Sequence, residues 1–153
     1  MATVKTVLRD PRGWAAYGHA FDVRADQGWE HPNIVVTLTP TEDMRRMFPM
    51  FSDLNMTVFG DINEVFIHAG RWLQELPNKS RLLPEAYKTY AINHEIGHCL
   101  GFPHPPVNSC TPDGESMVMN QQTLGTTCAK PNPYPTPMDN NRASYYFGFI
   151  VID

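Results

Sequence analysis

The pattern of apolar positions predicts strands in the first half of the chain. Residues 33–39 are dense in β-branched side chains and end at Pro40, so they predict a strand that is buried on at least one face. Two further apolar runs, residues 56–59 and 64–68, flank a short turn and predict an antiparallel hairpin, with its first strand at a sheet edge. A weaker alternation of apolar and polar positions over residues 21–25 predicts one more strand.

Helix signals surround these strands. Residues 2–8 predict a short helix that stops before a proline and a glycine, because proline disfavours helix in the residue that precedes it. Thr41 offers an N-cap for a short helix that runs to Met47. The longest predicted helix begins at Pro84, which loses no hydrogen bond in a first helical turn. Gly101 can end it in a left-handed conformation.

Length and composition indicate a single domain. The chain has 153 residues, of which 42% are hydrophobic and 18% charged, enough for one modest core. Eight of the fourteen prolines fall between residues 103 and 137, so the C-terminal part is expected to be irregular. We therefore expect one domain over residues 1–153, with the sheet and the longest helix in residues 1–101 and irregular structure in residues 102–153.

The net charge and the hydropathy of the chain argue against some classes of binding partner. A formal net charge of -4 argues against nucleic acid and anionic lipid, and the sequence contains no run of eighteen apolar residues that could span a membrane. The first residues lack the apolar stretch of a secretory signal. We therefore expect a cytoplasmic location if the chain is complete as written, and a secreted one if it is the mature part of an exported precursor. The sequence sets no oligomeric state.

Three cysteines permit at most one disulfide within the chain. Cys110 and Cys128 both lie in turn-rich sequence, where a pair could close a loop, although a reducing compartment would prevent the bond. Cys99 lies in the longest predicted helix and is interpreted as a small buried hydrophobic residue.

The same helix carries the candidate chemistry. His94 and His98 are four residues apart, so both imidazoles lie on one helical face and can bind a single Zn²⁺. Gly101 lets the chain leave the helix and double back, which brings His104 toward the same point. Three histidines leave a fourth position open for water, as expected of a catalytic zinc site. Glu95 can then accept a proton from that water.

A structural interpretation of this motif is also available. The histidines could belong to a buried helix in which core hydrogen bonds satisfy their ring nitrogens. That interpretation explains neither Gly101 nor His104, whereas a metal site explains both.

The extended motif resembles that of the metzincin clan of zinc metallopeptidases, His-Glu-x-x-His-x-x-Gly-x-x-His followed by a methionine turn. The resemblance implies that His94, His98 and His104 bind one Zn²⁺ and that Glu95 is the general base. It also implies an α/β fold of the minimal metzincin-like zincin type. Such a fold has a small twisted mixed sheet, a long active-site helix and an irregular proline-rich C-terminal part that lies beneath the metal.

Within that clan, the chain is similar to a family of actinobacterial metzincin-like proteins whose methionine turn reads Met-x-Gln-Gln-Thr. Residues 119–123 carry this pattern, so the resemblance names Met119, in preference to Met117, as the Met-turn residue. Members commonly have cysteines that flank the turn, which Cys110 and Cys128 match. The chain lacks the further cysteine pair that the family leads us to expect earlier in the sequence.

Substrate-binding candidates follow from the same resemblance. Some metzincins have a tyrosine two residues after the methionine, and here that position is Gln121. Gln121 or Gln122 is therefore a candidate donor to the substrate oxyanion, although a glutamine here could instead fix the loop backbone. The clan also suggests that an extended peptide pairs with the edge strand 56–59 and that Leu124 lines the main specificity pocket.

The predicted function is that of a zinc-dependent metalloendopeptidase that acts on a peptide or protein substrate, with zinc-bound water as the nucleophile and Glu95 as the base. Two alternatives stay open. One is a narrow intracellular hydrolase that processes or tailors a single peptide. The other is a zinc-dependent module that binds peptides without cutting them, against which the intact Glu95 argues.

Overall fold

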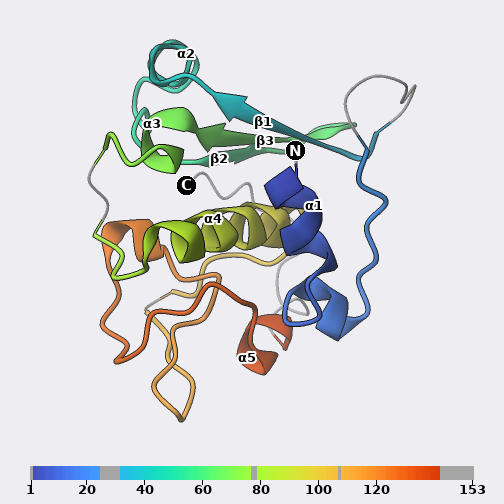
Figure 1. Cartoon of the computed structure of the whole chain (residues 1–153), viewed down its shortest axis with the longest axis vertical. Coiled ribbons are helices and arrows are strands. Elements are labelled where there is room, and N and C mark those ends of the chain that lie inside the picture. The colour runs from blue at the N-terminus through green and yellow to red at the C-terminus, as the bar shows by residue number, and fades with distance from the viewer. Residues whose placement is uncertain (1, 25–31, 77–78, 107, 142–153) are drawn as a thin grey trace.

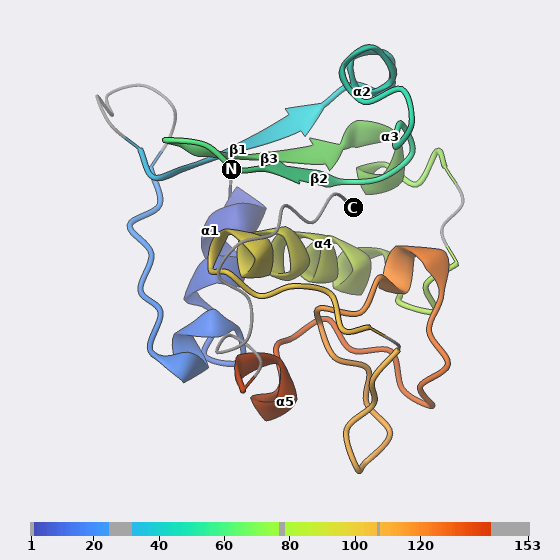
Figure 2. The same ribbon diagram turned by 180° about the vertical axis from the view of Figure 1, so that it is seen from behind.

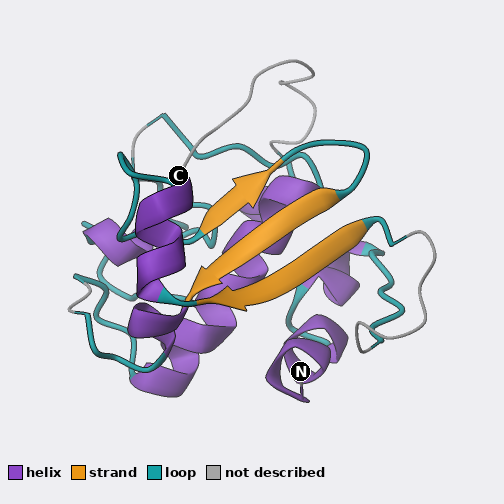
Figure 3. Ribbon diagram, turned by 90° about the horizontal axis from the view of Figure 1, so that it is seen from above, coloured by secondary structure: helices purple, strands orange, loops and turns teal. Residues whose placement is uncertain are grey.

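The computed structural model describes residues 2–24, 32–76, 79–106 and 108–141. Its sheet has three strands in the order β1-β3-β2, where β1 is Ile34–Thr39, β2 is Met56–Val58 and β3 is Asn63–His68. Strand β1 runs parallel to β3, and β2 runs antiparallel to it. The sheet is therefore mixed, and β2 lies at its edge, as the sequence predicts (Figure 3).

Seven helical segments accompany the sheet in the described residues. The α-helices are α1 (Ala2–Arg9), α2 (Thr41–Met47), α3 (Ala69–Trp72), α4 (Pro84–Cys99) and α5 (Pro137–Asn140). The 3₁₀ helices are η1 (Trp14–Tyr17) and η2 (Gln122–Leu124). None of the helices in the described ranges is long and apolar enough to cross a membrane.

Helix α4 forms the middle layer of the molecule. One side of it faces the sheet, and the irregular C-terminal segment lies along its other side (Figures 1 and 2). Val65 and Ile67 of β3 belong to the same buried cluster as Ile92 and Ile96 of α4, and Met119 reaches this cluster from the C-terminal layer. The fold is thus a mixed α/β domain whose longest helix is buried between two layers.

Two local predictions are wrong. Residues 18–24 are irregular and form no strand, and Ala25, the last residue of the predicted alternation, lies outside the described residues. Alternation over five residues is a weak signal, and no strand of the described residues pairs with this segment. Helix α2 has Pro40 and not Thr41 at its N-cap, with no side-chain cap bond, because the helical conformation already begins at Thr41.

Candidate metal centre

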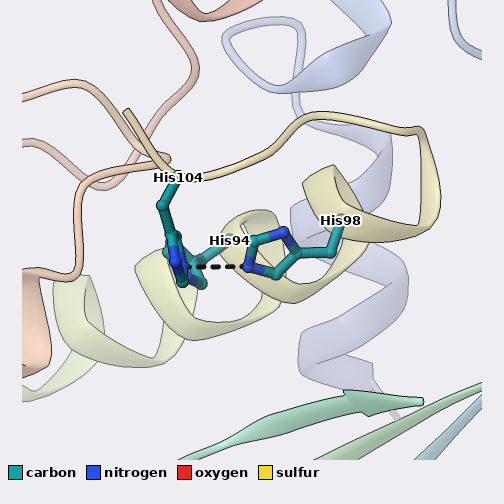
Figure 4. A group of neighbouring side chains, drawn as sticks. All are labelled: His94, His98 and His104. Carbon is teal, nitrogen blue, oxygen red and sulfur yellow. Dashed lines mark hydrogen bonds between the residues drawn. The ribbon is translucent and has the colours of Figure 1, made fainter. Parts of the chain in front are cut away.

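Helix α4 begins and ends where local sequence chemistry favours it. Pro84 occupies its first turn, where a missing N–H costs nothing. At the other end Gly101 has a φ of 90°, a left-handed conformation that favours glycine. The N–H groups of Gly101 and Phe102 donate to the carbonyls of His98 and Gly97, which closes the helix and turns the chain back over it. His104 follows directly on the returning segment (Figure 4).

Three imidazole rings converge at this turn. The Nε2 atom of His104 lies 3.0 Å from Nε2 of His94 and 3.1 Å from Nε2 of His98. His94 and His98 are buried and His104 is half-buried. Among the described residues, these three histidines form a group whose ligand atoms all lie within 4.8 Å of one another, so the group could hold a metal ion.

Main-chain carbonyls fix the two helical rings from behind. Nδ1 of His94 lies 2.8 Å from the carbonyl oxygen of Val118, and Nδ1 of His98 lies 2.9 Å from that of Phe102. A carbonyl oxygen only accepts hydrogen bonds, so Nδ1 must carry the hydrogen in both rings. Each Nε2 of His94 and His98 then presents a lone pair toward His104 in the neutral ring.

Counting hydrogens tests whether a cation fits this cluster. If all three rings are neutral, Nε2 of His104 can donate one hydrogen at most, and it faces two lone pairs at 3.0 and 3.1 Å. One of these close contacts must then bring two lone pairs together without a hydrogen between them. A cation at the centre would accept all three lone pairs at once, so the donor set of this chain fits a metal ion.

Glu95 lies on the same helix, one residue from the first histidine. Its side chain is only 1% exposed, and the hydroxyl of Thr57 on β2 donates to its Oε2 atom at 2.6 Å. Glu95 and His94 both line a small cavity together with Tyr90. The volume of this cavity, about 10 Å³, is close to the space that one water molecule requires.

Met119 packs against α4 on the side of the C-terminal layer. A Cβ atom placed on Gly97 would overlap the Met119 sulfur and would lie 2.8 Å from a ring carbon of Trp14. The glycine between the two metal-ligand candidates therefore lets the buried Met119 and Trp14 side chains reach the helix backbone. Met117, the other methionine of this segment, is also fully buried.

Asp139 is a buried residue that sequence analysis missed. Its carboxylate accepts hydrogen bonds from the N–H groups of Val118 at 3.2 Å and Met119 at 3.0 Å. It also accepts from the N–H group of Thr136 at 2.7 Å and from the Thr136 hydroxyl at 2.8 Å. Burial raises the pKa of this carboxyl, although the hydrogen bonds from Met119, Thr136 and Val118 oppose the rise. Asp139 thus ties α5 to the turn that holds Met119.

The two candidate oxyanion residues lie in different environments. Gln122 is fully buried, and its amide donates to the carbonyls of Met117 and Asn132 while its oxygen accepts from the Asn132 N–H. It therefore fixes the loop backbone and is not placed to contact a substrate, which corrects that candidate role. Gln121 and the half-exposed Leu124 both line the small cavity beside Glu95.

A larger cavity lies beside His104. Its volume is about 240 Å³, and its lining includes His104, Asn108, Gln121 and Leu124. Gln121 and Leu124 line both of these cavities. Leu124 thus lines a cavity, and its assignment to the main specificity pocket stays a prediction.

The structure decides the pairing of the cysteines, which the sequence left open. Cys110 and Cys128 form a disulfide. It closes the loop that contains Met119. Cys99 is free and half-buried at the end of α4, where burial raises the pKa of its thiol to about 12. A thiol with that pKa stays protonated at neutral pH, so Cys99 is unsuited to act as a nucleophile.

Comparison with known proteins places the chain in a family. No curated protein and no solved structure matches the sequence at a significant level. A family model described as "Protein of unknown function (DUF3152)" matches residues 1–141, which is most of the chain and includes the three histidines. The chain therefore belongs to the DUF3152 family.

Proposed function

We propose that this protein is a zinc metallopeptidase of the metzincin type that hydrolyses peptide bonds with Glu95 as its general base. The observation that carries the proposal is the convergence of three Nε2 atoms at 3.0 and 3.1 Å beside a buried glutamate. The sequence order of these residues, with glycine before the third histidine, adds the resemblance to metzincins.

The spacing of the nitrogens is compatible with zinc. Tetrahedral coordination with Zn–N bonds of about 2.0–2.1 Å separates the ligand nitrogens by about 3.3 Å. The contacts of His104 with His94 and His98 are within a few tenths of an ångström of that value. Three histidine ligands also leave one vertex for water or substrate, which is the ligand count of catalytic zinc sites.

The metal and the residues around the histidine cluster have separate roles in the proposed reaction. When bound, zinc would lower the pKa of a coordinated water to about 7 and would polarise the substrate carbonyl. The Glu95 carboxylate takes a proton from the attacking water and passes it to the leaving amine. Val118 and Phe102 keep the imidazoles of His94 and His98 in the required tautomer through their carbonyls. The small cavity that Glu95 lines has room for about one water molecule.

A peptide substrate has a sheet edge to pair with. Among the residues that the structure describes, strand β2 pairs with β3 alone, so we propose its other edge as the place where substrate adds. An extended peptide that adds to β2 is recognised through its backbone, and its side chains enter neighbouring pockets. The cavity beside His104, bordered by Leu124, is the pocket that we assign to a substrate side chain.

Digestion of a peptide library tests the proposal. The purified full-length protein, loaded with zinc, is incubated with a mixture of unstructured peptides, and the fragments are identified by mass spectrometry. We expect cleavage that a chelator abolishes and added zinc restores. Glu95→Gln should bind zinc as the wild type does, and its kcat should fall by about 10²- to 10⁴-fold.

The possible outcomes separate the proposal from its alternatives. Cleavage of many sequences supports a general endopeptidase, whereas cleavage of one peptide class indicates a narrow processing hydrolase. Peptides that are retained by the zinc-loaded protein but recovered intact after long incubation would indicate a binding module. A Glu95→Gln protein with wild-type turnover would show that Glu95 is not the base.

A further inference from the structure

Thr57 links the sheet edge to the proposed base. It is the middle residue of β2 and pairs with Val65 of β3, whose side chain belongs to the core between the sheet and α4. Paired residues share a face of the sheet, so Thr57 also faces the helix. Its side chain is 3% exposed, and its Oγ1 atom lies 2.6 Å from Oε2 of Glu95 and 3.3 Å from the Glu95 carbonyl oxygen.

The carboxylate is the stronger of these two partners. A hydroxyl has one hydrogen to donate, and 2.6 Å is the length of a hydrogen bond from a hydroxyl to a charged oxygen. The carbonyl contact of Thr57, at 3.3 Å, is long for an O–H donor. The hydroxyl therefore acts mainly on the carboxylate of Glu95.

The two side chains differ in stiffness. Glutamate has three rotatable side-chain bonds, whereas threonine is branched at Cβ and holds a restricted χ1. The backbone of Thr57 is also held in register against β3. A stiff donor on a paired strand can thus fix the rotation of a flexible acceptor, and a general base must stay within about 2.6–3.2 Å of the proton it takes.

We propose that Thr57 is a positioning residue that holds the Glu95 carboxylate in the orientation required for proton transfer. This inference rests on the proposed peptidase function. It also places base orientation and peptide docking on one strand, because the edge of β2 that does not pair with β3 is where we propose that substrate adds. Loss of the hydroxyl should therefore lower kcat and leave KM and zinc affinity nearly unchanged.

Three variants separate positioning from packing. Thr57→Val keeps the branched shape and removes the hydroxyl, and Thr57→Ser keeps the hydroxyl and removes a methyl group. Thr39→Val is the matched control, because Thr39 is equally buried in β1 and its hydroxyl contacts only the Thr37 carbonyl among the bonds described for it. Thr57→Ala serves in place of Thr57→Val if the valine protein does not fold.

Kinetics of the zinc-loaded variants give the first readout. The substrate is a fluorogenic peptide that the wild type cleaves, and zinc affinity is measured by competition with a chromophoric chelator. For Thr57→Val we expect kcat to fall about 10- to 100-fold, the effect of losing a hydrogen bond to a charged group, with KM and the zinc Kd within about twofold. Thr57→Ser should recover kcat to within about threefold of the wild type. Thr39→Val should match the wild type.

Crystal structures of the zinc-loaded proteins give a readout that needs no turnover. We expect one conformer of the Glu95 side chain in the wild type and in Thr57→Ser, and more than one in Thr57→Val. A Thr57→Val protein with wild-type kcat, or with Glu95 in the wild-type conformer alone, would overturn the inference. If the wild type cleaves no peptide, the proposed function fails, and the Glu95 conformers still decide the role of Thr57.

Discussion

Replacing Asp139 with alanine tests how the C-terminal layer supports the metal centre. The change removes a carboxylate that accepts four hydrogen bonds, two from the N–H groups of Val118 and Met119 and two from Thr136. Val118 and Met119 are buried, so water cannot readily replace the lost acceptor. Their N–H groups would be left without a partner inside the protein.

The magnitude follows from these contacts. Each buried N–H that loses its acceptor costs about 1–3 kcal/mol, and the capping interaction with Thr136 at the start of α5 contributes about 0.5–2 kcal/mol. Burial raises the pKa of Asp139, which means that desolvation of the charged form offsets part of this gain in the wild type. We therefore expect Asp139→Ala to lower the free energy of unfolding by about 3 kcal/mol.

The loss should also weaken metal binding at the candidate centre. The carbonyl of Val118 holds Nδ1 of His94, so a turn that is no longer anchored by Asp139 holds that ring less firmly. Loss of such outer contacts typically weakens metal affinity by about 10- to 100-fold, and we expect a tenfold increase in the zinc Kd. His104→Ala, which removes a ligand candidate outright, should weaken zinc binding much further.

Urea denaturation of the zinc-free protein and chelator competition for zinc measure the two effects separately. Asp113→Ala is the control, because Asp113 is an exposed aspartate of the same C-terminal segment. It should change neither quantity. An Asp139→Ala protein that unfolds within about 0.5 kcal/mol of the wild type would refute the energetic argument. Clear destabilisation with an unchanged zinc Kd would refute the connection from Asp139 to the histidine.

Three further predictions concern the surroundings of the centre. Gly97→Ala places a Cβ against the side chains beneath α4, so it should destabilise the fold by about 1–3 kcal/mol in urea denaturation, and an unchanged midpoint would show that those side chains yield freely. Replacing Cys110 and Cys128 together by serine should cost about 2–4 kcal/mol, because their disulfide closes a loop with a sequence separation of 18, and equal stability in oxidised and double-serine proteins would contradict this. A hydrogen bond from Arg12 lowers the pKa of Asp10 to about 2, so this stabilisation is present above pH 3.8 and is lost as pH falls through 2. Because Arg12 is exposed, Asp10→Asn should cost under about 1 kcal/mol at pH 5 and nothing measurable at pH 2, as urea denaturation at the two pH values will determine.

Local sequence rules account for the scaffold of the centre. The hairpin and its edge strand follow from two apolar runs around a short turn, and α4 follows from Pro84, the periodic stripe and Gly101. The approach of His104 to the helical histidines could also be predicted, because a left-handed glycine and a three-residue return restrict where that ring can lie. These features depend on contacts between residues close in sequence, which is why a single chain reveals them.

Contacts between distant segments could not be predicted in the same way. Asp139 lies twenty residues after Met119, and Thr57 lies 38 residues before Glu95, and neither belongs to a motif. For Gln122 the local sequence suggests a role that the packing of the protein rules out. Its neighbours in sequence suggest a substrate contact, but its amide is used by the Asn132 backbone, and only the packing of the C-terminal layer determines which glutamine faces the site.

The middle position of α4 explains why this site needs the whole domain. His94 and Glu95 are adjacent and therefore point about 100° apart on the helix. The first is held by Val118 of the C-terminal layer and the second by Thr57 of the sheet. Neither layer alone can orient both side chains, so the proposed pairing of metal ligand and base requires both layers to pack on α4. Changes far from the histidines should then affect the two functions separately: changes in the C-terminal layer should alter zinc affinity first, and changes in β2 should alter turnover first.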